Sequence, residues 1–220
     1  MSSTSEPAAP DRDCPLCPRL AAFREHNRVD HPDWYNAPVP SFGPADVRLL
    51  VVGLAPGLKG ANRTGRPFTG DYAGELLYKT LCEFGLAKGR YEQRIDDGLK
   101  LIGCRITNAV RCVPPENKPL PVEVRTCRRF LEAEIGALPR LTAILALGRI
   151  AHDATLAALG LRPAQYRFGH GVLHDLPSGL RLIDSYHCSR YNTQTGVLTE
   201  AMFREVIGVA RDTLERMPSR

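Results

Sequence analysis

Residues 51–74 read VVGLAPGLKGANRTGRPFTGDYAG, a stretch that begins as an apolar run and turns into a long loop. Four glycines interrupt the loop before the segment FTGD leads into a helical pattern. A connection between a strand and a helix usually takes about 2–6 residues, so this loop is far longer than a turn requires. Glycine lets the backbone approach a ligand closely, and loops at the carboxyl ends of parallel strands carry the sites of α/β proteins. The stretch predicts a strand, a binding loop and a helix.

Apolar runs of strand length alternate with helical patterns along the rest of the chain. The four runs predicted as main strands cover residues 47–53, 102–110, 141–147 and 180–185, with a short edge strand at 172–174. Apolar residues recur at helical spacing in residues 74–84, 121–138 and 149–159, and from about residue 199 onward. This alternation predicts a three-layer α/β/α sandwich with a central, mostly parallel four-stranded sheet.

The length of 220 residues suits one well-buried domain, which we expect to span residues 13–220 behind a disordered lead-in, residues 1–12. No run approaches the roughly 20 apolar residues of a membrane span, and the polar start lacks the apolar core of a secretory signal. We therefore expect a cytoplasmic protein and a monomer. The net charge of +5 is compatible with nucleic acid binding but is weak support for it.

Seven cysteines, an odd number in a chain without a signal sequence, argue against a disulfide framework. Cys14 and Cys17 form a C-x2-C pair, and fourteen residues separate Cys112 from Cys127. Four thiolates can hold either an iron–sulfur cluster or a structural zinc ion. The sequence alone leaves both possibilities open.

Polar and aromatic residues gather where three of the predicted strands end. In a doubly wound sheet these ends share one edge, so Phe68, Asp71, Asn108 and His187 can surround a small planar ligand. Phe68 would stack on the ligand, the amide of Asn108 suits an imide edge, and His187 could donate to a carbonyl oxygen that gains negative charge. Each residue alone has an ordinary structural explanation, including a solvated Asp71, and their joint placement favours a site.

Three segments resemble the motifs of the uracil-DNA glycosylase superfamily: GLAPGLKGANRTGRPFTGD, ITNAVRCVPPENKP and SYHCSRYNTQTG. They are similar in particular to family 5, the type-b uracil-DNA glycosylases of bacteria and archaea. The resemblance runs from about Cys14 to the final helix, and it implies the uracil-DNA glycosylase fold. In other families an acid or amide follows the first glycine of the first motif, whereas family 5 has an apolar residue there, Leu54 in this sequence.

The resemblance also implies a role for each matching residue. Asp71 positions water or stabilises the transition state, and His187 supports the departing base, so these two are the expected catalytic residues. The expected base-binding residues are Phe68, Asn108, Gly53 and Ala55. The expected DNA-binding residues are Arg63, Arg66, Arg190 and Tyr191, the last two in a loop that enters the duplex. The expected ligands of a structural [4Fe–4S] cluster are Cys14, Cys17, Cys112 and Cys127.

The activity implied by this resemblance is that of a monofunctional DNA repair enzyme. It flips uracil out of DNA and hydrolyses the N-glycosidic bond, leaving an abasic site. The apolar Leu54 motivates a wider substrate range that includes hypoxanthine and xanthine. One alternative is a non-catalytic iron–sulfur DNA-binding protein of the same fold, although binding alone needs neither Asp71 nor His187. Another is a zinc-stabilised module with a small-molecule ligand, which metal analysis would distinguish.

Overall fold

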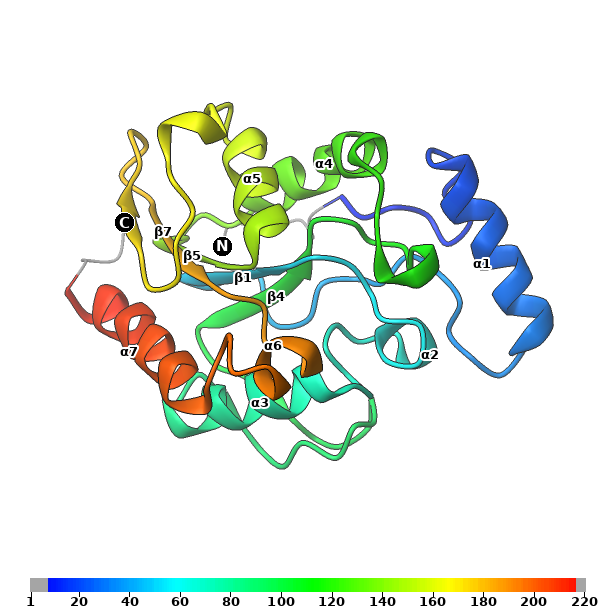
Figure 1. The fold of residues 1–220 in the computed structure, drawn as a ribbon, viewed down its shortest axis with the longest axis horizontal. Coiled ribbons are helices and arrows are strands. Elements are labelled where there is room, and N and C mark those ends of the chain that lie inside the picture. The colour runs from blue at the N-terminus through cyan, green and yellow to red at the C-terminus, as the bar shows by residue number, and fades with distance from the viewer. Residues whose placement is uncertain (1–7, 217–220) are drawn as a thin grey trace, which may run out of the picture.

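The computed structural model describes residues 8–216, which form three layers with a sheet between two sets of helices (Figure 1). Residues 1–7 of the expected lead-in lie outside the described residues. Residues 8–12 are irregular, and the Arg12 guanidinium lies over the ring of Tyr35 at 5.8 Å. Within residues 8–216 no helix is long and apolar enough to cross a membrane.

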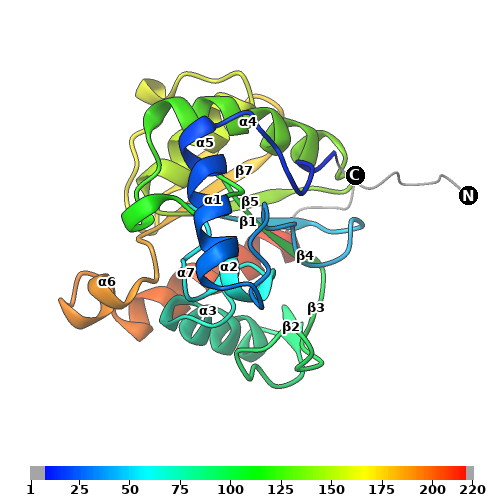
Figure 2. The same cartoon turned by 90° about the vertical axis from the view of Figure 1, so that its right-hand side faces the viewer.

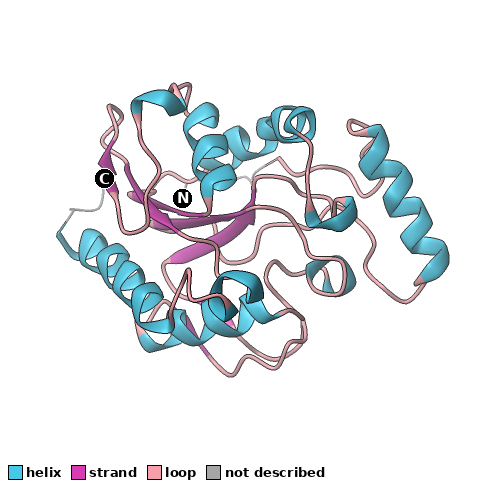
Figure 3. Cartoon of the chain, viewed as in Figure 1, coloured by secondary structure: helices cyan, strands magenta, loops and turns pink. Residues whose placement is uncertain are grey.

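The central sheet, drawn in magenta between the helices in Figure 3, has five strands in the order β4-β1-β5-β7-β6. Four of them are parallel, as predicted: β1 (Leu49–Gly53), β4 (Cys104–Asn108), β5 (Ala143–Leu147) and β7 (Arg181–Ser185). The short edge strand β6 (Leu173–Asp175) pairs antiparallel with β7 and brings the strand count from four to five. A separate two-stranded ribbon pairs β2 (Ala87–Lys88) with β3 (Lys100–Leu101).

Helices cover both faces of the sheet because its central strands are apolar on both sides. One face packs on α3 (Tyr72–Glu83) and α7 (Glu200–Arg216), and the other packs on α4 (Pro121–Gly136) and α5 (Arg149–Ala158). The remaining helical segments are α1 (Pro18–Asp30), α2 (Ala61–Thr64), α6 (Arg190–Gln194) and the 3-10 turns η1 (Pro115–Asn117) and η2 (Pro163–Gln165). The predicted loops after β1 and β7 therefore each contain a short helix.

Helix α1 lies outside these three layers, where it passes between α4 and α2 (Figure 2). Arg19 on α1 binds Glu123 on α4 at 2.8 Å from Nε to Oε1. Past the end of α1, the Asn36 side chain accepts a hydrogen bond from the Asn62 amide on α2 at 2.9 Å. The amino-terminal segment therefore contacts both the loop after β1 and the start of α4.

Strand register brings the expected site residues to one edge of the sheet. Gly53 and Asn108 are direct partners at the ends of β1 and β4. Leu147 and Ser185 are partners at the ends of β5 and β7, so the chain leaves the sheet two residues before His187. The carboxyl ends of the parallel strands thus deliver the three predicted loops to one side.

Candidate active site

One cleft at this edge is lined by Phe68, Asp71, Asn108 and His187 together. Leu54 and Ala55, from the loop after β1, line the same cleft. The structure therefore brings the four predicted residues to one cleft. Roles for the individual residues follow from their surroundings.

Phe68 forms one wall of the cleft. Its side chain is buried, and its ring faces the imidazole of His187 at 6.0 Å between centroids, with the ring planes 26° apart. The Phe68 backbone has a φ of +52°, a left-handed conformation that is uncommon for an aromatic residue. A Cβ on Gly53 would lie 2.6 Å from the Phe68 ring, so only glycine fits beneath it.

Asn108 offers a buried hydrogen-bond acceptor to this cleft. The residue is 3% exposed, and its Oδ1 is buried with no hydrogen-bond partner among residues 8–216. Leaving a buried acceptor unpaired costs about 1–3 kcal/mol, so such an atom in a cleft is suited to a ligand N–H group. Gly53 makes room for this atom too, because a Cβ there would lie 2.4 Å from Asn108 Oδ1.

Asp71 sits at the N-cap of α3, where its Oδ1 accepts a hydrogen bond from the Gly74 N–H at 3.1 Å. Its Oδ2 packs against the glycines of the loop after β1, since a Cβ on Gly60 would lie 2.5 Å from that oxygen and one on Gly57 would lie 3.1 Å away. Burial raises the pKa of Asp71, while the amides of Gly74 and Ala73 oppose that rise. Two glycines of the loop therefore accommodate a carboxylate of the protein.

His187 faces Phe68 across the cleft. Burial lowers the pKa of His187 to about 4, so the imidazole is neutral at physiological pH. Its backbone carbonyl accepts a hydrogen bond from Asn192 Nδ2 at 2.8 Å, which fixes the loop before α6. The next residue, Cys188, is fully buried, and its Sγ lies 3.5 Å from the carbonyl oxygen of Ala73 at the start of α3. The neutral ring can donate one hydrogen bond.

The four residues expected to bind DNA differ in their exposure to solvent. Arg63, Arg190 and Tyr191 are exposed, and Arg190 lines the cleft. Arg66 is only 3% exposed, and its guanidinium forms two hydrogen bonds with Asp97, at 2.8 Å and 2.6 Å. The expected phosphate contact of Arg66 is therefore corrected to an internal ion pair, because its charged group does not reach the surface.

Sequence reasoning missed several polar residues that line the cleft. Lys59 and Tyr72 both lie in the glycine-rich stretch, residues 51–74, and the Arg190 guanidinium lies 5.6 Å from the centre of the Tyr72 ring. Asn117 enters from η1 with a φ of +57°, and Ser189 caps α6. The place of Lys59 in the glycine-rich stretch could have indicated that it lies near the cleft, whereas nothing in the sequence around Asn117 indicates that it lines the cleft.

The four cysteines expected to bind a metal centre lie together at another, smaller pocket. Cys14, Cys17, Cys112 and Cys127 all line it, and each is a free thiol. Burial, together with the neighbouring cysteine sulfurs, raises the pKa of Cys112 to about 12, although Arg24 opposes the rise. The buried Arg24 guanidinium stands beside the thiols, since its Nη1 donates to the Cys14 carbonyl oxygen at 3.2 Å and its Nε lies 3.6 Å from Glu25 Oε1. This donor set fits a thiolate-ligated centre with net negative charge.

A flat cleft wall, a carboxylate and a neutral histidine lie together at the carboxyl edge of a parallel sheet, an arrangement suited to a planar heterocycle beside an acidic group. The comparison with known families agrees with this arrangement. The family model described as the uracil DNA glycosylase superfamily matches residues 40–211. The chain belongs to this superfamily.

Named relatives cover most of the chain. The type-5 uracil-DNA glycosylase of Thermus thermophilus is 51% identical over 203 residues, which cover 90% of this chain and 92% of the relative. The type-5 uracil-DNA glycosylase of Mycobacterium tuberculosis is 42% identical over 207 residues, covering 90% and 77%. That of Pyrobaculum aerophilum is 39% identical over 198 residues, covering 88% and 86%.

Proposed function

We propose that this protein is a uracil-DNA glycosylase of DNA repair, which removes uracil by hydrolysing its N-glycosidic bond and leaves an abasic site. The observation that carries the proposal is the unpaired Oδ1 of Asn108 in a cleft walled by Phe68 and closed by Asp71 and His187. The similarity to type-5 uracil-DNA glycosylases supports it. We assign the chain to the type-b group on the same grounds, while the cytoplasmic location and the monomeric state stay predictions.

Base recognition follows from the two walls of the cleft. Uracil within a duplex is out of reach, so the nucleotide must be flipped at a cost of a few kcal/mol. The base then stacks on Phe68, and its imide N–H donates to the free Oδ1 of Asn108. Leu54 adds an apolar surface that makes no hydrogen-bond demand, which supports hypoxanthine and xanthine as further substrates.

Bond cleavage uses the other two residues. Breaking the N-glycosidic bond leaves positive charge on the sugar and places the bonding electron pair on the base. The Asp71 carboxylate stabilises the sugar cation and accepts a proton from the water that attacks it. The neutral His187 donates a hydrogen bond to the carbonyl oxygen where the negative charge of the base collects. Both charges of the transition state therefore have a partner.

Exposed groups at the rim would contact the DNA backbone and the gap left by the base. Arg190 and the 73% exposed Tyr191 begin α6, next to His187. The exposed Arg63 lies beside the turn before Asp71, since a Cβ on Gly70 would lie 2.9 Å from its Nη2. We place phosphate contacts on these arginines because their charges are accessible.

A panel of substrates tests the function directly. Duplexes that contain uracil, hypoxanthine, xanthine or an intact control base are incubated with the protein, and abasic sites are measured over time. We expect excision of uracil and no reaction at the control base. Equal rates on all four duplexes, or no product from the uracil duplex, would refute the proposal.

The pH dependence of excision should follow Asp71. The carboxylate acts in its ionised form, so the single-turnover rate falls as the pH drops through the pKa of Asp71. Burial raises that pKa, so the loss begins at a higher pH than for a free aspartate with a pKa of about 4. His187 is already neutral well below the ordinary histidine pKa of about 6.5, so no inflection is expected there. Rates measured from about pH 5 to about pH 8 check this; an activity that increases on acidification contradicts it.

The cysteine pocket is proposed as the site of a structural [4Fe–4S] cluster. Cys14, Cys17, Cys112 and Cys127 would hold it, and it would supply a cross-link without taking part in bond cleavage. The ligands come from the segment before α1, from the loop after β4 and from α4. Such a centre would fix α1 to the body of the protein beside Asn108. A visible absorption band distinguishes it from zinc, which is colourless.

A further inference from the structure

The turn Pro67–Gly70, which carries Phe68, has a backbone that needs support. Phe68 has a φ of +52° and Gly70 a φ of +90°, so two of its four residues are left-handed. Glycine adopts such angles freely, whereas a non-glycine residue in a sparsely populated region persists only when its surroundings hold it. The question is which groups hold Phe68 in the orientation that forms the cleft wall.

A single hydroxyl group closes this turn from outside the cleft. The Tyr91 hydroxyl donates a hydrogen bond to the Phe68 carbonyl oxygen at 3.1 Å and accepts one from the Gly70 N–H at 3.1 Å. Tyr78 adds a third bond, from its hydroxyl to the Pro67 carbonyl oxygen at 2.6 Å. Gly74 leaves room for this arrangement, because a Cβ there would lie 1.8 Å from the Phe68 oxygen.

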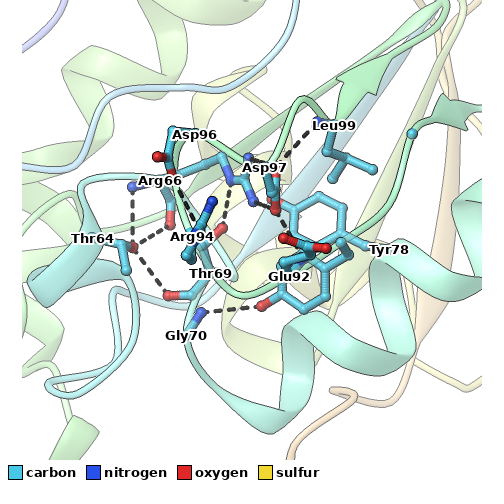
Figure 4. Close-up of polar contacts among 12 residues, drawn as sticks. Thr64, Arg66, Thr69, Gly70, Tyr78, Glu92, Arg94, Asp96, Asp97 and Leu99 are labelled. Atoms are coloured by element: carbon cyan, nitrogen blue, oxygen red, sulfur yellow. Dashed lines mark hydrogen bonds and ion pairs between the residues drawn. The ribbon is translucent and has the colours of Figure 1, made fainter.

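The ion pair between Arg66 and Asp97, drawn in Figure 4, holds the segment that begins at Tyr91. The Asp97 carboxylate accepts hydrogen bonds from the backbone N–H groups of Glu92 and Leu99, which closes the segment that carries Tyr91. Arg66 binds Asp97 on one side, and its Nε donates to the Thr69 hydroxyl at 2.7 Å on the other. The side chain of Asp97 is fully buried.

The same ion pair thus links the turn to the segment between α3 and β3. The Arg66 guanidinium lies 5.5 Å from the centre of the Tyr78 ring and 5.9 Å from that of Tyr91, so both tyrosines pack on it. Burial opposes ionisation of Asp97, but its hydrogen bonds to Arg66 and to the N–H groups of Glu92 and Leu99, with the charge of Arg66, together outweigh burial and lower the pKa of Asp97 to about 2. The pair therefore stays ionised at any pH at which the enzyme works.

We propose that Tyr91 is a positioning residue of the active site, which holds the left-handed turn so that the Phe68 ring meets the flipped base. Tyr91 does not line the cleft, so it acts through Phe68 and touches no substrate. The inference rests on the proposed function, because the base that stacks on Phe68 is the one excised. It also gives a role to the polar segment between β2 and β3, which carries Tyr91 and Asp97.

The test compares Tyr91→Phe with the unchanged protein in single-turnover excision of uracil at saturating enzyme. The ring and its packing remain, and only the hydroxyl with its two hydrogen bonds is lost. We expect the excision rate to fall about tenfold, the effect of losing two hydrogen bonds of ordinary strength that hold the reactive geometry. Thermal unfolding of the same samples verifies that both proteins are folded at the assay temperature.

A double-mutant cycle separates positioning from general stability. In a Phe68→Ala background the ring is absent, so adding Tyr91→Phe should cost at most about twofold. The control is Tyr35→Phe, which removes a hydroxyl that donates to the Pro38 carbonyl oxygen at 3.4 Å, away from the turn; it should excise at the unchanged rate. The inference is overturned if Tyr91→Phe excises at the unchanged rate, or if its tenfold loss persists without Phe68. Failure of the unchanged protein to excise uracil would refute the proposed function instead.

Discussion

Replacing Asp71 with Asn should reduce the single-turnover rate of uracil excision by about 10²- to 10³-fold, the usual cost of removing one group that stabilises transition-state charge. Asn keeps the shape of the side chain but carries no charge and cannot accept a proton from water. Asn is also as good an N-cap as Asp, so the hydrogen bond to the Gly74 N–H is retained and α3 keeps its start. The loss would therefore measure the carboxylate charge alone.

Two further measurements make this prediction specific. Asp71→Ala should lose the same catalytic factor and, in addition, about 1 kcal/mol of stability from the missing helix cap. Affinity for a uracil-containing duplex should stay nearly unchanged in both variants, because Phe68 and Asn108 still hold the base. If Asp71→Asn excises uracil at the unchanged rate, Asp71 has no part in bond cleavage. If both variants lose DNA binding, Asp71 acts in recognition.

Much of the candidate site could be predicted from sequence, because Gly53, Asn108 and His187 lie at or just after strand ends. Gly53 and Asn108 close two parallel strands, and the register makes them direct partners. Phe68 and Asp71 come from the glycine-rich stretch, and His187 comes two residues after β7. An apolar run that ends in polar residues fixes such placement locally, without knowledge of distant contacts.

The pairing of buried charges was not accessible in the same way. Arg66 sits among loop residues and resembles a phosphate ligand, yet its partner Asp97 is 31 positions away. Arg105 and Arg111 likewise pair with the buried Glu134 on α4. A buried arginine and an exposed one have the same local sequence pattern, and only the tertiary structure shows which carboxylate lies beside each. Tyr91 was missed for the same reason, since its role depends on bonds to a turn 21–23 residues earlier.

Replacing Cys112 with Ser should remove the visible absorption of the proposed cluster and destabilise the protein together. In the proposed cluster, Cys112 would join the loop after β4 to sulfurs from the amino-terminal segment and α4. Only a small apolar cluster, which includes Leu20, Val110 and Phe130, packs around these sulfurs. Loss of a metal centre belongs to the mechanisms that cost about 4 kcal/mol or more. For a chain of this size that corresponds to a fall in Tm of about 8–16 °C.

Cys82→Ser is the matched control for that experiment. Cys82 is a half-buried free thiol on α3, outside the cysteine pocket, so the chemical change is the same but the ligand set is intact. We expect this variant to keep the visible spectrum of anaerobically purified protein and to unfold within a few degrees of the unchanged protein.

Limited proteolysis gives a second measurement on Cys112→Ser. The chain between α1 and β1 should be cleaved sooner than in the unchanged protein, because without the cluster α1 is held by weaker contacts, such as the ion pair between Arg19 and Glu123. An unchanged visible spectrum in Cys112→Ser would exclude Cys112 as a ligand. If the unchanged protein is colourless and contains zinc, the proposed cluster is wrong and the same four sulfurs hold zinc. The pocket accommodates four thiolates in either case.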